Sequence, residues 1–108
     1  MFRTKNCGEL RLANVGEEVI LAGWVQSVHN LGALTFVDLR DRYGITQLAF
    51  NEDSSDDLKS KAGKLGREFV VQAKGTVAER YSKNKNLPTG EVEILVKDFF
   101  KKLKGGNL

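Results

Sequence analysis

Cysteine, histidine, proline and tryptophan each occur only once in this sequence, and it has no long apolar run. The single cysteine, Cys7, excludes an internal disulfide and is typical of a reducing compartment. One cysteine and one histidine, His29, are too few for a protein-built zinc site, so we expect no metal. The lack of a long apolar run excludes a transmembrane helix, and residues 1–4 do not open a signal peptide. We therefore expect a cytoplasmic protein without a membrane partner.

The chain also has little excess charge. Its 108 residues carry a formal net charge of +3, with a pI near 9.1, well short of the excess expected of a protein that coats duplex DNA. The length is that of one domain. Basic residues gather at 83–85 and 97–104. We expect residues 1–97 to form the domain, and residues 98–108 to be a basic tail that is frayed or forms a helical turn.

Hydrophobic periodicity predicts an all-β protein with one short helix. Five segments show the apolar patterns of strands, and they span residues 18–29, 34–40, 45–50, 68–80 and 91–96. Between the third and the fourth, Leu58, Ala62 and Leu65 are spaced as on one face of a helix, which Gly66 would end. Five strands with a helix between strands 3 and 4 follow the order of the OB-fold, a five-stranded Greek-key barrel. Such barrels bind oligonucleotides on the face of strands 2 and 3.

Three residues carry more detailed expectations. Gly23, in the interior of the long first strand, predicts a bulge or a sharp bend. Trp24 is expected to pack in the barrel, because its neighbours of the same parity are mainly apolar. Gly44 is expected to take the positive φ that closes a tight hairpin. Together they predict a bent first strand and a short turn between the second and third strands.

The hairpin of residues 34–50 combines an aromatic ring with an amide. Val37 and Leu39 share one face of its first strand, and Phe36 lies on the other. On the return strand, Gln47 has the parity opposite to that of Leu48. A ring that can stack beside an amide that can read a base edge is typical of proteins that bind unpaired nucleic acid. We therefore expect this face to bind single-stranded nucleic acid.

Three stretches of the chain resemble one known family. They are CGELRLANVGEEVILAGWV, FVDLRDRYGITQ and GTVAERYSKNKNLPTGEVEI, and they are similar, in order and spacing, to the N-terminal domain of bacterial aspartyl-tRNA synthetase. The resemblance covers residues 1–96. It implies an OB-fold domain that binds the anticodon loop of the aspartate tRNA by stacking and hydrogen bonding.

The same resemblance implies that this chain is not an enzyme by itself. Nothing in it resembles the class II catalytic domain that follows this domain in the family. We therefore expect no catalytic residues and no cofactor here. In the whole aspartate-tRNA ligase, a homodimer, ATP and magnesium would serve the catalytic domain.

The resemblance also implies roles for single residues. Phe36 matches the aromatic on which the middle anticodon base stacks, and Gln47 matches the amide that hydrogen-bonds the same base. Positions around the other anticodon bases are matched by Arg80, Asn84, Asn86 and Glu93. Ser27 and His29, which complete the expected RNA-binding set, stand where the family usually has arginines. Their presence predicts fewer phosphate contacts and a shallower salt dependence of RNA binding.

Plainer interpretations remain open for these residues. Gln47 could be a solvated strand residue, Asn84 and Asn86 could form turns, and Glu93 could be a surface charge. Two other functions also remain open. One is a general single-stranded nucleic-acid-binding domain. The other is a protein-interaction module with an altered binding face made of Ser27, His29, Leu31, Ala33, Leu34 and Thr35.

Overall fold

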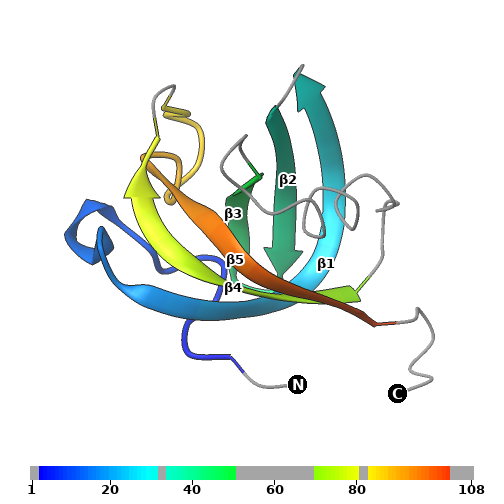
Figure 1. The fold of residues 1–108 in the computed structure, drawn as a ribbon. Helices are drawn as coiled ribbons and strands as arrows, with labels where there is room; N and C mark the ends of the chain where they lie inside the picture. The colour runs from blue at the N-terminus through cyan, green and yellow to red at the C-terminus, as the bar shows by residue number, and fades with distance from the viewer. Residues whose placement is uncertain (1–2, 32–33, 51–69, 81–82, 103–108) are drawn as a thin grey trace.

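The computed structural model describes residues 3–31, 34–50, 70–80 and 83–102. In chain order, these residues form the 3-10 helix η1 (Leu12–Asn14) and the strands β1 (Glu18–Leu31), β2 (Leu34–Asp41), β3 (Gly44–Phe50), β4 (Val70–Glu79) and β5 (Val92–Lys102) (Figure 1). The helix predicted between strands 3 and 4 falls on residues outside the described ones. Among the described residues, no helix is long and apolar enough to cross a membrane.

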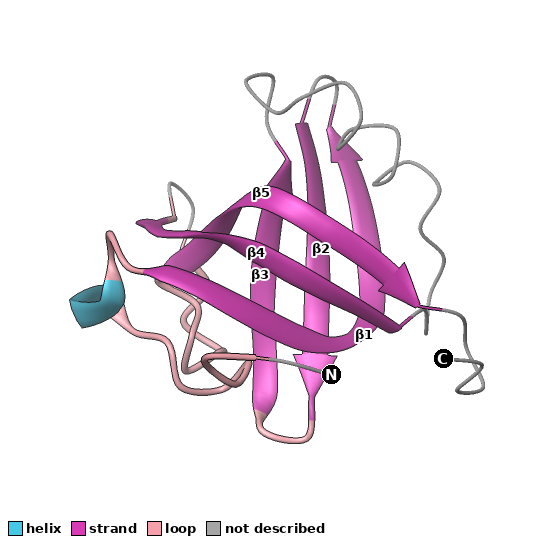
Figure 2. Cartoon of the chain, turned by 60° about the horizontal axis from the view of Figure 1, so that its bottom comes forward, coloured by secondary structure: helices cyan, strands magenta, loops and turns pink. Residues whose placement is uncertain are grey.

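The strands close into a barrel in the order β1–β2–β3–β5–β4. Neighbouring strands are antiparallel except β3 and β5, which are parallel. Residues 18–24 of β1 pair with β4, and residues 24–31 pair with β2, so one long strand takes part in both halves of the barrel. In Figure 2, β2 and β3 run side by side while β4 and β5 cross them. The predicted five-stranded, all-β OB-fold is confirmed.

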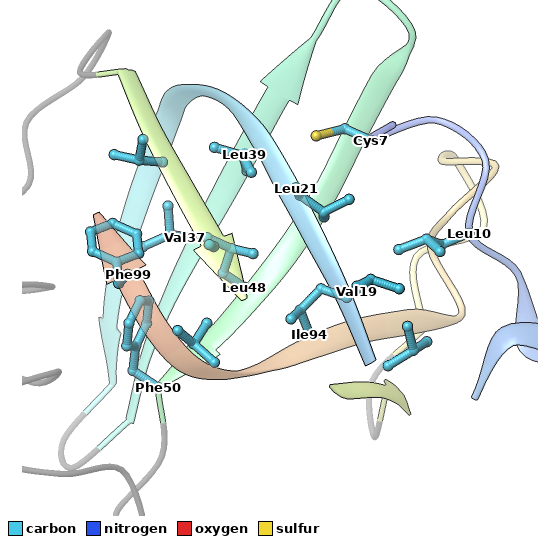
Figure 3. Close-up of a cluster of buried hydrophobic side chains, with 14 of the residues drawn as sticks. Cys7, Leu10, Val19, Leu21, Val37, Leu39, Leu48, Phe50, Ile94 and Phe99 are labelled. Atoms are coloured by element: carbon cyan, nitrogen blue, oxygen red, sulfur yellow. The ribbon is translucent and has the colours of Figure 1, made fainter. Parts of the chain in front are cut away.

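Alternation along each strand fills the barrel with apolar side chains. Figure 3 shows the rings of Phe50 and Phe99 at one end of the core and Leu10 at the other. The two rings meet edge to face, with centroids 5.5 Å apart and planes at 82°, an arrangement that stabilises aromatic pairs. The buried cluster consists of Cys7, Leu10, Val19, Leu21, Val25, Val37, Leu39, Leu48, Phe50, Val71, Ala73, Val77, Val92, Ile94, Val96 and Phe99.

Trp24 does not pack in the barrel as expected. Its side chain points away from the core and keeps 39% of its surface exposed. Val19, Leu21 and Val25 have the inward parity of β1 and are buried. The expectation was wrong because both faces of β1 are rich in apolar groups. Ile20 and Ala22, which share the Trp24 parity, lie outside the buried cluster, and Val28 packs against it only after the register shift between Val25 and Ser27.

The bulge in β1 lies beyond Gly23. The register between β1 and β2 shifts between Val25 and Ser27, so the prediction of a bulge at the glycine was wrong in position. Gly23 is needed for another reason. A Cβ at this position would lie 2.3 Å from the carbonyl oxygen of Arg40, which is too close for any side chain.

Gly44 also has a role different from the expected one. Among the described glycines, a positive φ occurs at Gly16 and not at Gly44. A Cβ on Gly44 would lie 2.8 Å from the Cα of Gly8. Gly44 therefore allows the N-terminal segment to approach the hairpin closely, and the prediction of a left-handed turn residue was wrong.

The last strand is longer than predicted. It was expected to end at Val96 and be followed by a frayed or helical segment, but β5 continues to Lys102 along β4. Residues 97–102 are mostly charged and show too little apolar alternation to predict this continuation. Lys97 is exposed and lies 3.2 Å from the Glu18 carboxylate, whereas Phe99 is fully buried. The hydrogen bond from Lys97 to Glu18 lowers the pKa of that carboxyl group.

Cys7 is fully buried, and its surroundings make its thiol unreactive. Its backbone N–H donates to Oδ2 of Asp41 and its carbonyl accepts from the Thr46 hydroxyl, both at 2.8 Å. Burial, followed by the charge of Asp41, raises the pKa of the Cys7 thiol far above its ordinary value. Because the thiolate is the reactive form, Cys7 is protected both by its location and by its protonation.

Near pH 8, we expect a thiol reagent to modify Cys7 at least about tenfold more slowly in the native protein than in the denatured protein. The release of the coloured thiol from an aromatic disulfide reagent measures both rates. Because the folded-state pKa is raised, the thiol stays protonated as the pH rises through the range in which a free cysteine ionises. Equal rates in native and denatured protein would contradict the burial of Cys7.

Candidate nucleic-acid interface

An open groove on the outer face of β2 and β3 gathers most of the predicted site. Its volume is about 770 Å³, within the range of about 300–1,000 Å³ of small-ligand pockets. Six of the eight predicted RNA-binding residues line it, while Ser27 and Asn86 do not. The lining consists of Gln26, His29, Leu34, Phe36, Asp38, Ile45, Gln47, Ala49, Arg80, Asn84, Leu87, Glu93 and Leu95.

Phe36 presents its ring beside a small residue. The ring is half-buried on β2, and its partner directly across the hairpin is Ala49 of β3. Side chains opposite each other on an antiparallel pair stand about 5 Å apart, so the methyl group of Ala49 leaves the β3 side of the ring open. The partner of Phe36 on the other side is His29 of β1. Gln47 is a diagonal neighbour of Phe36 on the same face. The ring and the amide that the sequence predicted to act together do lie together.

Gln47 is hydrogen-bonded at both ends of its amide. Nη2 of Arg80, just after β4, donates to Oε1 of Gln47 at 2.8 Å. Nε2 of Gln47 donates to Oε1 of Glu93 on β5, also at 2.8 Å. The parallel pairing of β3 with β5 sets Gln47 directly opposite Glu93. Gln47 is therefore a half-buried residue of the groove with both ends of its amide hydrogen-bonded.

Arg80 also carries an unsatisfied donor. Its Nε is buried and has no hydrogen-bond acceptor among the described residues. Leaving a buried donor of a charged group unpaired costs free energy, so its presence calls for an explanation other than stability.

Ser27 and His29 form a small polar cluster with Asp38 at the edge of the groove. The Ser27 hydroxyl donates to Oδ2 of Asp38 at 2.6 Å. Nε2 of His29 lies 3.5 Å from the same oxygen and 3.3 Å from the Ser27 hydroxyl. The Ser27 hydroxyl thus donates its hydrogen bond within the protein, whereas the His29 side chain is 57% exposed and lines the groove.

Asn84 organises the loop that borders the groove. Its Oδ1 accepts from the Asn86 N–H at 2.9 Å, and its backbone N–H donates to the Gly90 carbonyl at 2.9 Å. The Thr89 hydroxyl ties the loop to the Ile45 carbonyl of β3. Asn84 is therefore a turn former that also lines the groove, while Asn86 is exposed, takes part in the same turn and is not among the lining residues.

The charges of the groove nearly balance. Asp38 and Glu93 are the acidic residues that line it, and Arg80 and His29 are the basic ones. Such a surface suits base edges better than a run of phosphates. Sequence reasoning missed the apolar lining residues Ile45 and Leu95, whose outward parity was the available signal. Within the described segments, no group of three or more His, Cys, Asp or Glu residues could hold a metal ion.

A five-stranded barrel with an aromatic ring and paired polar groups on its β2–β3 face has the architecture of OB-fold domains that bind nucleic acid. Residues 19–101 match the tRNA anticodon family, whose members are OB-fold nucleic acid binding domains. The chain belongs to this family.

The similar proteins make the assignment narrower. The chain is 58% identical over 98 residues to the aspartate–tRNA ligase of Bacteroides thetaiotaomicron. The aligned stretch covers 91% of this chain and 17% of that relative. It thus spans about a sixth of the length of that relative. The resemblance to the N-terminal region of bacterial aspartate–tRNA ligases is confirmed, and the chain corresponds to the anticodon-binding domain of such a ligase.

Two solved structures show the same barrel. Asparaginyl-tRNA synthetase from Pyrococcus horikoshii, complexed with asparaginyl-adenylate, superposes with a TM-score of 0.80 at 30% identity. The match covers 95% of this chain and 23% of that one. OBody AM2EP06, bound to hen egg-white lysozyme, superposes with a TM-score of 0.85 at 28% identity and covers 96% of each chain.

Proposed function

We propose that this domain binds the unpaired anticodon bases of the aspartate tRNA within an aspartate–tRNA ligase. The observation that carries the proposal is the groove on β2 and β3, where Phe36 lies open beside Ala49 and next to the amide of Gln47. In this proposal the middle anticodon base stacks on Phe36 and pairs with Gln47. Asn84 and the loop around it contact the neighbouring bases, and His29 lies at the edge nearest the backbone.

The proposal assigns no reaction step to this chain. The ligase would act in the cytoplasm as a homodimer, and ATP and magnesium would serve its catalytic domain. The contribution of the OB barrel is selection of the tRNA, which needs stacking and base-edge hydrogen bonds rather than chemistry.

A titration with short RNAs tests the proposal. We expect the protein to bind an aspartate anticodon stem-loop at least about fivefold more tightly than the same stem-loop with its middle anticodon base replaced, because one base contact is worth about 1–3 kcal/mol. Repeating the titration at two salt concentrations should give a shallow dependence, because the groove holds few free cations. Equal affinity for the two stem-loops and for an unrelated single strand would instead favour a general single-strand binder.

A second candidate is a protein-interaction module on the same face. It is favoured by the near balance of charge in the groove and by the internal use of the Ser27 hydroxyl. The OBody structure is of a barrel of this kind bound to lysozyme. The absence of detectable RNA binding at low salt, together with a protein partner on the β2–β3 face, would select this candidate.

A further inference from the structure

We propose that Arg80 and Glu93 are positioning residues that hold the Gln47 amide in one of its two possible orientations. Through this orientation they determine which base edge the groove accepts. The inference rests on the proposed function for its ligand, but its structural basis is a property of the free protein. It assigns to Arg80 and Glu93 a role different from the direct contacts with other anticodon bases that the family resemblance implies.

A glutamine amide has two ends of almost the same shape and opposite hydrogen-bonding character. The oxygen accepts, the nitrogen donates, and a rotation of half a turn exchanges them. An amide free to rotate would therefore offer a base two opposite patterns. A side chain that reads a base needs one of these orientations to be much more stable than the other.

The two partners of Gln47 supply that preference. The guanidinium of Arg80 can only donate, and it bonds Oε1 at 2.8 Å. The Glu93 carboxylate, when ionised, can only accept, and it bonds Nε2 at 2.8 Å. After a half-turn of the amide, the Arg80 donor would face the amide N–H groups and the Glu93 carboxylate would face the amide oxygen. Both contacts would be repulsive, so this pair of charges selects a single orientation.

The remaining capacity of the amide defines what can bind. One N–H of Nε2 and one lone pair of Oε1 are left after the two bonds to Arg80 and Glu93. They form an adjacent donor and acceptor in a fixed order. A base edge that presents an acceptor and a donor in the complementary order can form both bonds, while the reverse order meets two like groups.

The energetics of Arg80 fit a role in positioning rather than in stability. The residue is half-buried, and its Nε donor has no acceptor in the described part of the chain. An unpaired buried donor of a charged group costs free energy, which offsets part of what the bond to Gln47 contributes to stability. Methionine at this position would keep much of the aliphatic volume and remove the unpaired donor, so Arg80→Met should leave the unfolding midpoint nearly unchanged.

A double-mutant cycle on RNA binding tests the role of Arg80. The variants are Arg80→Met, Gln47→Ala and the two combined, titrated with the aspartate anticodon stem-loop and with its middle-base variant. We expect each single change to weaken binding about tenfold and the double change to weaken it no more than Gln47→Ala alone. Losses that multiply to about a hundredfold would show that Arg80 contacts the RNA independently, which would overturn the proposal.

Arg40→Met is the matched control. Arg40 also donates to a glutamine, at 2.7 Å to Oε1 of Gln26, and it lies on β2. This substitution removes the same charge from the same region of the barrel without touching Gln47. Arg80→Met should reduce discrimination between the two stem-loops, whereas Arg40→Met should not. A loss of discrimination of equal size in both variants would contradict the positioning role of Arg80.

The orientation of the amide can be tested without RNA. In the nuclear magnetic resonance spectrum of the free protein, we expect the two side-chain proton signals on Nε2 of Gln47 to be further apart than those of a free glutamine amide, because one of the two protons is bonded to the Glu93 carboxylate. The separation should fall toward that of a free amide in Arg80→Met and in Glu93→Ala, and Glu93→Gln should restore part of it because its amide oxygen still accepts. Intact signals in a protein that does not bind the stem-loop would contradict the proposed function and leave the positioning role standing. Signals unaffected by these changes would contradict the positioning role.

Discussion

Replacing Phe36 by alanine is expected to weaken binding of the anticodon stem-loop by about 5- to 150-fold, because base–aromatic stacking is worth about 1–3 kcal/mol per base. The ring lies on the groove face of β2, opposite Ala49, and is half-buried. Ala49, directly opposite on β3, is too small to substitute for the ring. Fluorescence or calorimetric titration with the stem-loop measures the loss directly.

Tyr43→Ala provides the matched control for Phe36. Tyr43 is an exposed aromatic, 54% accessible, at the tip of the hairpin and outside the groove. Its removal should leave RNA affinity unchanged within error. The Phe36→Ala barrel should remain folded, which circular dichroism can confirm. If Tyr43→Ala lowers affinity as much as Phe36→Ala does, the binding surface has been assigned to the wrong part of the barrel.

Replacing Phe50 by alanine is expected to lower the free energy of unfolding by about 3–5 kcal/mol, as removal of a buried phenylalanine ring does. Phe50 is 1% exposed and packs edge to face on Phe99. Domains of this size have a total stability of about 5–15 kcal/mol, so the variant would lose about a fifth of it or more. The cause is the loss of both apolar burial and the contact between the rings.

Urea unfolding followed by circular dichroism measures the effect on Phe50. Phe50→Leu should lose much less stability than Phe50→Ala, because it fills most of the cavity. Val15→Ala, at a position that is 46% exposed, should change stability by no more than about 0.5 kcal/mol. A Phe50→Ala variant as stable as Val15→Ala would contradict the position of Phe50 in the core.

Local alternation was enough to predict the groove face of the hairpin. Val37, Leu39 and Leu48 point inward, and Phe36 and Gln47 point outward, as their parities require. These residues belong to one hairpin whose register is set by its own short turn. The barrel order could also be predicted, because five strands and their spacing leave few alternatives.

The features that sequence reasoning missed depend on contacts between distant segments. The exposure of Trp24 depends on which face of β1 meets the core. The need for glycine at Gly44 arises from the approach of Gly8. The bonds from Arg80 and Glu93 to Gln47 join three strand regions that are far apart in sequence. Parity predicts which face a residue takes, but it does not predict which residue of another strand lies beside it.

The length of β5 shows the same limit for charged sequences. The end of this strand contains Lys97, Lys101 and Lys102, and Phe99 is its buried residue. A single buried aromatic in a basic segment gives too weak a periodic signal to be distinguished from a tail. The pairing of this segment with β4 supplies the hydrogen bonds that make it a strand.

Mapping chemical-shift changes on the protein during titration with the aspartate anticodon stem-loop tests the central claim most directly. The account predicts that the largest changes fall on Phe36, Gln47, Arg80, Asn84 and Glu93, with little change at Trp24 and Tyr43, which lie outside the groove. Changes centred on Trp24 and Tyr43, or no changes at all at low salt, would contradict the assignment of the β2–β3 groove as the site of anticodon binding.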